Sequence, residues 1–178
     1  MPTHIEKLAA FVANLRYESI PERTRRAALM QLLDMVAAVH ASAHSRSVMQ
    51  VLDAAAGFAA TPPDRGSTVL ASGGRCGPAE AAMLNAICSM AFDYDDIVWM
   101  GHTCHSAVFA SLAVAEHERV AWRELVTAIV AANEVGGRLG ASCFFGPLNG
   151  QMWTFIHLAG AAAAASKLLG LDAEKTAH

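Results

Sequence analysis

An all-α fold of about seven or eight helices is predicted by three features of the sequence. Apolar residues recur at helical spacing through most of the 178 residues. Helix-start residues precede several of these runs, and glycine and proline gather in only one long irregular stretch. A chain of this length is expected to form a single domain, residues 1–178.

Three helices are expected in the first third of the chain. The first covers residues 3–15, with Thr3 as its N-cap. The second begins at Pro21, a residue that suits a first helical turn, and the third covers residues 45–58 and ends near Gly57. In the second helix, one apolar stripe is expected, made of Leu29, Leu32, Leu33, Val36 and Val39.

An irregular stretch and a very apolar helix follow. Residues 61–78 hold three prolines and several glycines around a short β-prone segment, "STVLA". Residues 78–92 are so rich in apolar side chains that we expect a helix buried on all sides.

The last third of the chain is again helical. Helices are expected over residues 105–116 and 122–139, followed by a loop at 143–151. A long helix over 154–171 carries the segment "AGAAAAAS", whose small side chains allow close packing against neighbouring helices. Asp172 is placed to cap a final helix.

The composition excludes several classes of protein and favours association. Charged residues make up 16% of the chain, against a usual share of about 25%, so we expect part of the surface to be covered by another copy or another chain. The net charge of −3 and the lack of a basic stripe argue against nucleic acid binding. No apolar run reaches the ~20 residues that a bilayer requires, and no signal peptide is visible. The four cysteines show no metal or disulfide spacing, which favours the cytoplasm.

The stretch "MAFDYDDIVWMGHTCH" concentrates ionisable groups between two apolar helices. Asp93, Asp95 and Asp96 are followed within ten positions by His102 and His105. Crowded carboxylates and imidazoles suit proton transfer near neutral pH. The sequence therefore predicts a proton-handling site where these helices meet.

Two other interpretations of this stretch stay open. Asp and His are adequate ligands for a divalent cation, but neither an HExxH motif nor an EF-hand spacing is present, so we expect no metal ion. In a purely structural interpretation, Asp93 or Asp96 caps a helix and His105 is a core residue. His157, in the middle of an apolar helix, is expected to be structural, and Trp153 could line a pocket.

Four stretches, in order along the chain, carry a resemblance to a known family: "LAAFVANLRYESIPERTRRAALMQLLDMVAAV", "AEAAMLNAICSMAFDYDD", "VTAIVAANEVGGRLGAS" and "GAAAAASKLLGLDAEKTAH". Their order and spacing resemble the N-terminal helical part of the MmgE/PrpD family. That family includes 2-methylcitrate dehydratase, cis-aconitate decarboxylase and iminodisuccinate epimerase. The resemblance implies an all-helical bundle that lacks the family's α/β domain and is incomplete relative to the family.

The resemblance also implies lyase or isomerase chemistry without a cofactor. Such enzymes act on small di- or tricarboxylates by dehydration, decarboxylation or epimerisation, moving a proton next to a carboxylate. The family aspartate maps onto Asp93 or Asp95, and the family histidine maps most nearly onto His102, with His105 as the alternative. A second family histidine falls on Gln151, which can hold a carboxylate only by hydrogen bonds. The set expected to bind substrate is Gln151, Asp96 and Trp153.

The family's basic residues for substrate carboxylates lie beyond this chain's last residue. We therefore expect one half of an enzyme, completed by a partner chain with the missing C-terminal half or by a homodimer interface. Because the family's "HPS" proline is absent and Gln151 replaces a histidine, the alternative is a non-catalytic helical assembly or binding module. Neither nucleic acid nor a membrane is an expected partner.

Overall fold

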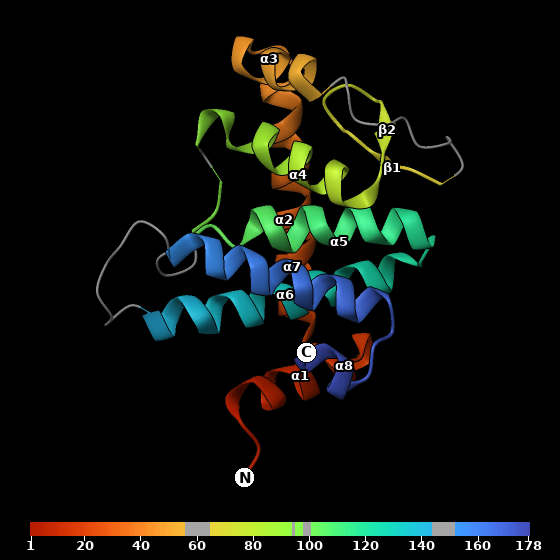
Figure 1. Ribbon diagram of the computed structural model, residues 1–178, viewed down its shortest axis with the longest axis vertical. Helices are drawn as coiled ribbons and strands as arrows, with labels where there is room; N and C mark the ends of the chain where they lie inside the picture. Colours follow the sequence, from red (N-terminus) through yellow and green to blue (C-terminus); the bar gives the residue numbers. More distant parts are fainter. Residues whose placement is uncertain (56–64, 94, 98–100, 144–151) are drawn as a thin grey trace.

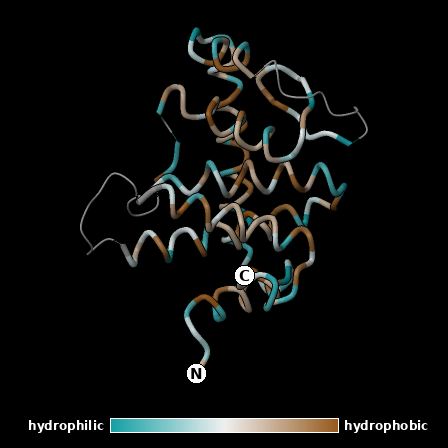
Figure 2. The backbone as a smooth tube through the Cα atoms, in the orientation of Figure 1, coloured by the Kyte–Doolittle hydropathy of each residue, from teal (hydrophilic) through white to brown (hydrophobic). Residues whose placement is uncertain are grey.

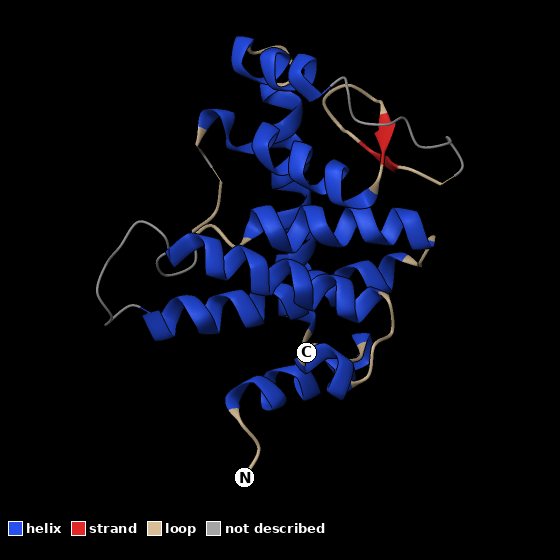
Figure 3. Ribbon diagram, in the orientation of Figure 1, coloured by secondary structure: helices blue, strands red, loops and turns tan. Residues whose placement is uncertain are grey.

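The computed structural model describes residues 1–55, 65–93, 95–97, 101–143 and 152–178. Within these residues the chain forms eight α-helices and one small antiparallel sheet of two strands (Figures 1 and 3), which confirms the predicted all-α class. None of the helices in the described part of the chain is both long and apolar enough to cross a bilayer.

The helices follow the predicted order closely. Short 3-10 turns, η1 (Tyr17–Ser19) and η3 (Met90–Phe92), precede α2 and follow α4. The strands β1 (Ser67–Thr68) and β2 (Arg75–Cys76) lie in the stretch expected to be irregular. The helices are α1 (His4–Asn14), α2 (Glu22–Ser42), α3 (Arg46–Ala54), α4 (Pro78–Ser89), α5 (Cys104–Glu118), α6 (Trp122–Cys143), α7 (Met152–Leu168) and α8 (Ala173–Ala177).

Local signals explain where several helices begin. The Thr3 hydroxyl accepts a hydrogen bond from the Glu6 amide, and the Glu6 carboxylate accepts one from the Thr3 amide, so the predicted cap is a full capping box. Asp172 caps α8 as predicted, by accepting from the Lys175 amide at 2.8 Å. Pro21 stands one position earlier than expected, as the N-cap of α2.

Three helices form the centre of the molecule. Helices α5, α6 and α7 lie against one another, α4 packs on α5, and α2 runs behind them in contact with α4, α5 and α6 (Figure 1). Helices α1 and α8 pair at the end of the molecule opposite α3. The start of α5 therefore lies deep in the structure, between α4 and α7.

Small side chains bring α5, α6 and α7 close together. Ala107, Ala132 and Ala164 are fully buried against one another, one from each helix. A Cβ on Gly160 of α7 would lie 2.9 Å from the Ser106 hydroxyl oxygen of α5. The expected close packing of the alanine-rich helix is therefore present. As a result, α7 lies in close contact with the first turn of α5.

The stripe predicted in α2 is only partly buried, with Val39 at 1% exposure, and the prediction that the next apolar helix is buried on all sides is wrong. In α2, Leu29 and Leu33 are 41% and 62% exposed. In α4, Met83 and Ile87 are 45% and 39% exposed, so this helix is not buried all round. Hydrophobic residues are spread along the helices of the molecule (Figure 2), and packing buries only those on the face that fits the neighbouring helices. The buried residues of α2 are Ala28, Met35, Ala38, Val39 and Ser42.

Candidate functional site

The predicted cluster lies in the connection between α4 and α5. Asp93 ends η3 in a left-handed backbone conformation, with φ of 53°, which breaks the helix and turns the chain. Asp95 and Asp96 follow in the loop. The chain then reaches His102 just before α5 and His105 in the first turn of that helix.

Asp95 holds both histidines through a single oxygen. Its Oδ2 lies 2.6 Å from Nδ1 of His102 and 2.9 Å from Nε2 of His105. The two imidazole rings are stacked at an angle of 28°, with centroids 6.0 Å apart. The side chains of Asp95, His102 and His105 are 1%, 12% and 6% exposed, respectively. Three of the four predicted catalytic residues therefore form one buried cluster.

Ser89 and Cys104 also contact this cluster. The Ser89 hydroxyl oxygen lies 2.9 Å from Nδ1 of His105, and the Cys104 thiol approaches Oδ2 of Asp95 at 3.5 Å. Burial lowers the pKa of His105, although the negative charge of Asp95 acts in the opposite direction. Burial, together with the nearby Asp96 and Asp95, raises the pKa of Cys104 far above its ordinary value, so this thiol stays protonated.

A separate hydrogen-bond chain holds Asp96. The Gln31 side-chain amide donates to Oδ2 of Asp96, and the Asn133 amide donates to the Gln31 oxygen at 2.7 Å. The Thr103 hydroxyl donates to the Asn133 oxygen at 2.7 Å. These residues link α2, α6 and the start of α5 to the acidic loop. Gln31, Asp96 and Asn133 also line a pocket of about 280 Å³.

His157 adds a third imidazole that the sequence interpretation treated as structural. Its Nδ1 lies 3.2 Å from the Ser106 hydroxyl oxygen, and its ring centroid is 6.0 Å from that of His105. Burial and the neighbouring imidazoles lower its pKa. Helix periodicity alone placed His157 on an apolar face, but contact between α5 and α7 brings it to the cluster.

The remaining predicted residues lie elsewhere. Asp93 is exposed and does not join the Asp95 cluster. Gln151 falls outside the described residues, and the side chain of Trp153 is not described. The expected roles of these three residues stay predictions.

Two carboxylate oxygens of the site are buried without a hydrogen-bond partner among the described residues. They are Oδ1 of Asp95 and Oδ1 of Asp96. Such atoms are costly unless a ligand, water or ion occupies the space beside them. Asp95, His102 and His105 also offer three ligand atoms that all lie within 4.8 Å of one another, which is compatible with a metal ion.

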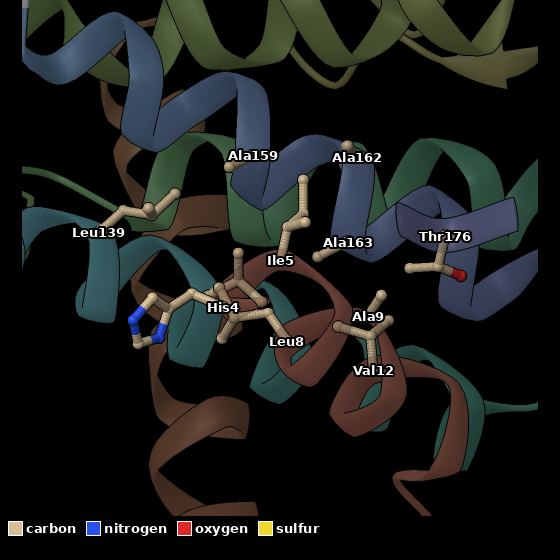
Figure 4. Close-up of a pocket in the computed structure, with 11 residues that line it drawn as sticks. His4, Ile5, Leu8, Ala9, Val12, Leu139, Ala159, Ala162, Ala163 and Thr176 are labelled. Carbon is tan, nitrogen blue, oxygen red and sulfur yellow. The ribbon is translucent and has the colours of Figure 1, made fainter. Parts of the chain in front are cut away.

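An apolar pocket of about 370 Å³ lies away from this cluster. Ile5, Leu8 and Val12 of α1 line one side, and Ala159 and Ala162 of α7 line the other (Figure 4). Because its lining is mostly apolar, this pocket resembles a groove between two packed helices more than a catalytic site.

Fold and cluster together define an all-α protein with a buried carboxylate–imidazole site. The family model for the MmgE/PrpD N-terminal domain matches residues 6–178, and the chain belongs to this family. This finding confirms the resemblance carried by the four sequence stretches. No curated protein matches the chain in sequence.

Proposed function

We propose that this chain is one half of a lyase or isomerase that moves a proton next to a carboxylate of a small di- or tricarboxylate. A partner chain, or a second copy of this chain, completes the site. One observation carries the proposal: a single buried oxygen of Asp95 contacts an imidazole nitrogen of both His102 and His105. The reaction needs a base and an acid, and the two imidazoles can supply them.

Asp95 fixes the orientation of His102 by accepting from its Nδ1, so the proton is exchanged with substrate at Nε2. In a dehydration, one imidazole takes the proton from the carbon next to a carboxylate. The other imidazole gives a proton to the departing hydroxyl group, and water leaves. His105 is neutral near pH 7 because burial lowers its pKa, and it serves as the base once its Nε2 turns from Asp95 towards the substrate.

Substrate binding is proposed at the Asp96 side of the cluster. The buried Oδ1 of Asp96 could accept a hydrogen bond from a substrate hydroxyl, and the amides of Gln31 and Asn133 border the same pocket. Gln151, which precedes α7, and Trp153, in the first turn of α7, are proposed to contact the substrate. The positive charges that match the carboxylates would come from the completing chain.

The test is turnover and proton exchange with and without a completing chain. The chain would be purified alone and together with a polypeptide that carries the C-terminal half of the family. Each preparation would be incubated with small di- and tricarboxylates in deuterated water, and NMR would follow deuterium entry next to the carboxylate. We expect exchange or turnover in the complex, with a loss of at least ~100-fold in His102→Gln and in Asp95→Asn.

Matched variants separate the two candidate aspartates. If Asp95 is the working carboxylate, Asp95→Asn loses turnover and Asp93→Asn keeps most of it; the reverse result would move the role to Asp93. Asp34→Asn, an exposed carboxylate on α2, is the neutral control. Full turnover in His102→Gln, with helix content unchanged by circular dichroism, would contradict the proposal.

The second candidate is a non-catalytic helical assembly or binding module. The exposed apolar side chains of α7, Phe155 at 63% and Leu158 at 64%, favour a protein contact whether or not chemistry survives. A stable complex that shows no exchange with any carboxylate tested would favour this alternative.

A further inference from the structure

We propose that Asp95, His102 and His105 bind a divalent transition-metal ion such as zinc. The inference does not rest on the proposed reaction, because it concerns only which ion these side chains hold. A bound ion would occupy the imidazole lone pairs, so it would compete with proton transfer at the same site.

The geometry is close to that of a metal site. The ligand atoms lie 2.6 Å and 2.9 Å from Oδ2 of Asp95, and all three lie within 4.8 Å of one another. In a tetrahedral zinc site, with metal–ligand bonds of about 2.1 Å, ligand atoms are about 3.4 Å apart. Side-chain shifts of less than about 1 Å would therefore open this cluster enough to admit the ion.

The charge balance favours a cation. The Asp95 side chain is 1% exposed, and its described partners are two imidazoles and a thiol, none of which carries a permanent positive charge. Oδ1 of Asp95 is buried and has no hydrogen-bond partner among the described residues. A buried carboxylate without a cationic partner is costly, and a divalent ion would offset that cost.

A count of protons around His105 supports the same conclusion. When the single hydroxyl proton of Ser89 is donated to the carbonyl oxygen of Ala86 at 2.8 Å, Ser89 accepts from Nδ1 of His105. A neutral imidazole has one N–H, and Nε2 then directs a lone pair at Oδ2 of Asp95, 2.9 Å away. A metal ion between these atoms would turn that repulsion into two bonds. Ser89 would serve as the hydrogen-bonded support that metal-binding histidines usually have.

The ligand types indicate which ions fit. Imidazole nitrogens suit zinc, cobalt, nickel and copper, whereas magnesium and calcium prefer sets of oxygen ligands. We therefore expect Zn²⁺ and Co²⁺ to bind and Mg²⁺ to leave the protein unchanged. A four-coordinate Co²⁺ ion would also give a visible absorption spectrum that reports the geometry.

The test is direct titration of the metal-free chain, stripped with a chelator, with Zn²⁺ in a calorimeter and with Co²⁺ in a spectrophotometer. We expect one ion per chain. His102→Ala and His105→Ala should each weaken binding by at least ~100-fold, and Ser89→Ala should weaken it by about 10- to 100-fold. His40→Ala removes an exposed histidine of α2 and should leave the affinity unchanged.

Circular dichroism would check that each variant keeps its helices. Failure of the metal-free wild-type chain to take up a stoichiometric ion would overturn the proposal. Binding of equal strength in His102→Ala and His105→Ala would overturn it as well, because the ion would then lie elsewhere. Either failure leaves the proton-transfer proposal standing, because that proposal is tested with substrate and without metal.

Discussion

Asn133 is the residue through which α6 holds the acidic loop. Its side chain accepts from the Thr103 hydroxyl, donates to Gln31, and also donates to the Ile129 carbonyl oxygen at 3.0 Å. Gln31 in turn holds Asp96. Because Thr103 is 1% exposed, its hydroxyl has no access to water if Asn133 is lost.

Asn133→Leu is therefore expected to lower the free energy of unfolding by about 1–3 kcal/mol, the cost of a buried polar group left without its partner. Urea unfolding followed by circular dichroism measures this change. Asn14→Leu, at an exposed position of α1, should stay within about 0.5 kcal/mol of the wild type. Equal effects of the two substitutions would contradict the role given to Asn133.

His157 makes folding stability depend on pH. Burial lowers its pKa in the folded chain below the ordinary value of 6.5, so the native state binds fewer protons than the unfolded state in that range. His105 acts in the same direction. The stabilisation is complete above pH 6.5 and is lost as the pH falls from 6.5 through the folded-state pKa.

The loss of stability between about pH 7.5 and about pH 5.5 is expected to be smaller in His157→Gln than in the wild type. Urea midpoints at both pH values measure it, with His40→Gln as the control for an exposed histidine. If His157→Gln and His40→Gln show the same pH dependence as the wild type, His157 does not titrate as described.

Sequence spacing was enough to find the centre of the site, but not its surroundings. Asp95, His102 and His105 lie within eleven positions of one another, so a local count of ionisable residues places them together. Gln31 and Asn133 reach the Asp96 side of the site from α2 and α6, and His157 reaches His105 from α7. Whether these residues approach the site depends on how helices that are far apart in the sequence pack together. The spacing of residues along the chain does not show this.

At the level of helices, apolar periodicity and capping residues were enough to predict which helices exist and in what order. They were not enough to predict which face of each helix is buried. Leucines at helical spacing in α2 predicted a stripe that includes Leu29 and Leu33, yet both are exposed. The helix instead buries Ala28, Met35 and Ala38. Where two faces of a helix are apolar, the choice between them is made by the shape of the neighbouring helices.

The crossing of α5 and α7 shows how closely neighbouring helices approach each other. A Cβ at Gly160 would lie 2.9 Å from the Ser106 hydroxyl oxygen and 3.6 Å from the Ala132 carbonyl oxygen. Ser106 can rotate, but the branched methyl groups of valine would also meet the Ala132 backbone. Gly160→Val is thus expected to cost about 1–3 kcal/mol of unfolding free energy and to disturb the contact between Ser106 and His157.

Thermal or urea unfolding measures the effect of this substitution. Ala162→Val adds similar bulk two residues along the same helix, where the side chain faces the open groove of Figure 4. It should cost only the small difference in helix propensity, under about 1 kcal/mol. If Gly160→Val were as mild as Ala162→Val, the close approach of α5 and α7 would not be a source of stability.

At the scale of the whole molecule, the low share of charged residues agrees with the presence of exposed apolar side chains on α1 and α7. Phe155 and Leu158 of α7 and Ile5 of α1 are 63%, 64% and 58% exposed, and the groove between these helices is lined by apolar side chains. Leu158 lies four residues before Ala162, hence on the same side of α7, and Ala162 lines that groove. Covering one such large side chain contributes about 1.5–3 kcal/mol, so a second chain that covered this face would gain several such contributions.

Leu158→Glu is therefore expected to weaken association of the purified chain, either with itself or with a polypeptide that carries the C-terminal half of the family. Light scattering coupled to size-exclusion chromatography measures the mass of each species. Met49→Glu introduces the same charge at a 53% exposed position on α3 and should leave the mass unchanged. Because both positions are exposed, neither substitution should disturb the fold. If both substitutions weakened association equally, the cause would be general repulsion between the more negatively charged chains. An assembly unaffected by Leu158→Glu would place the contact on another surface, such as the exposed leucines of α2.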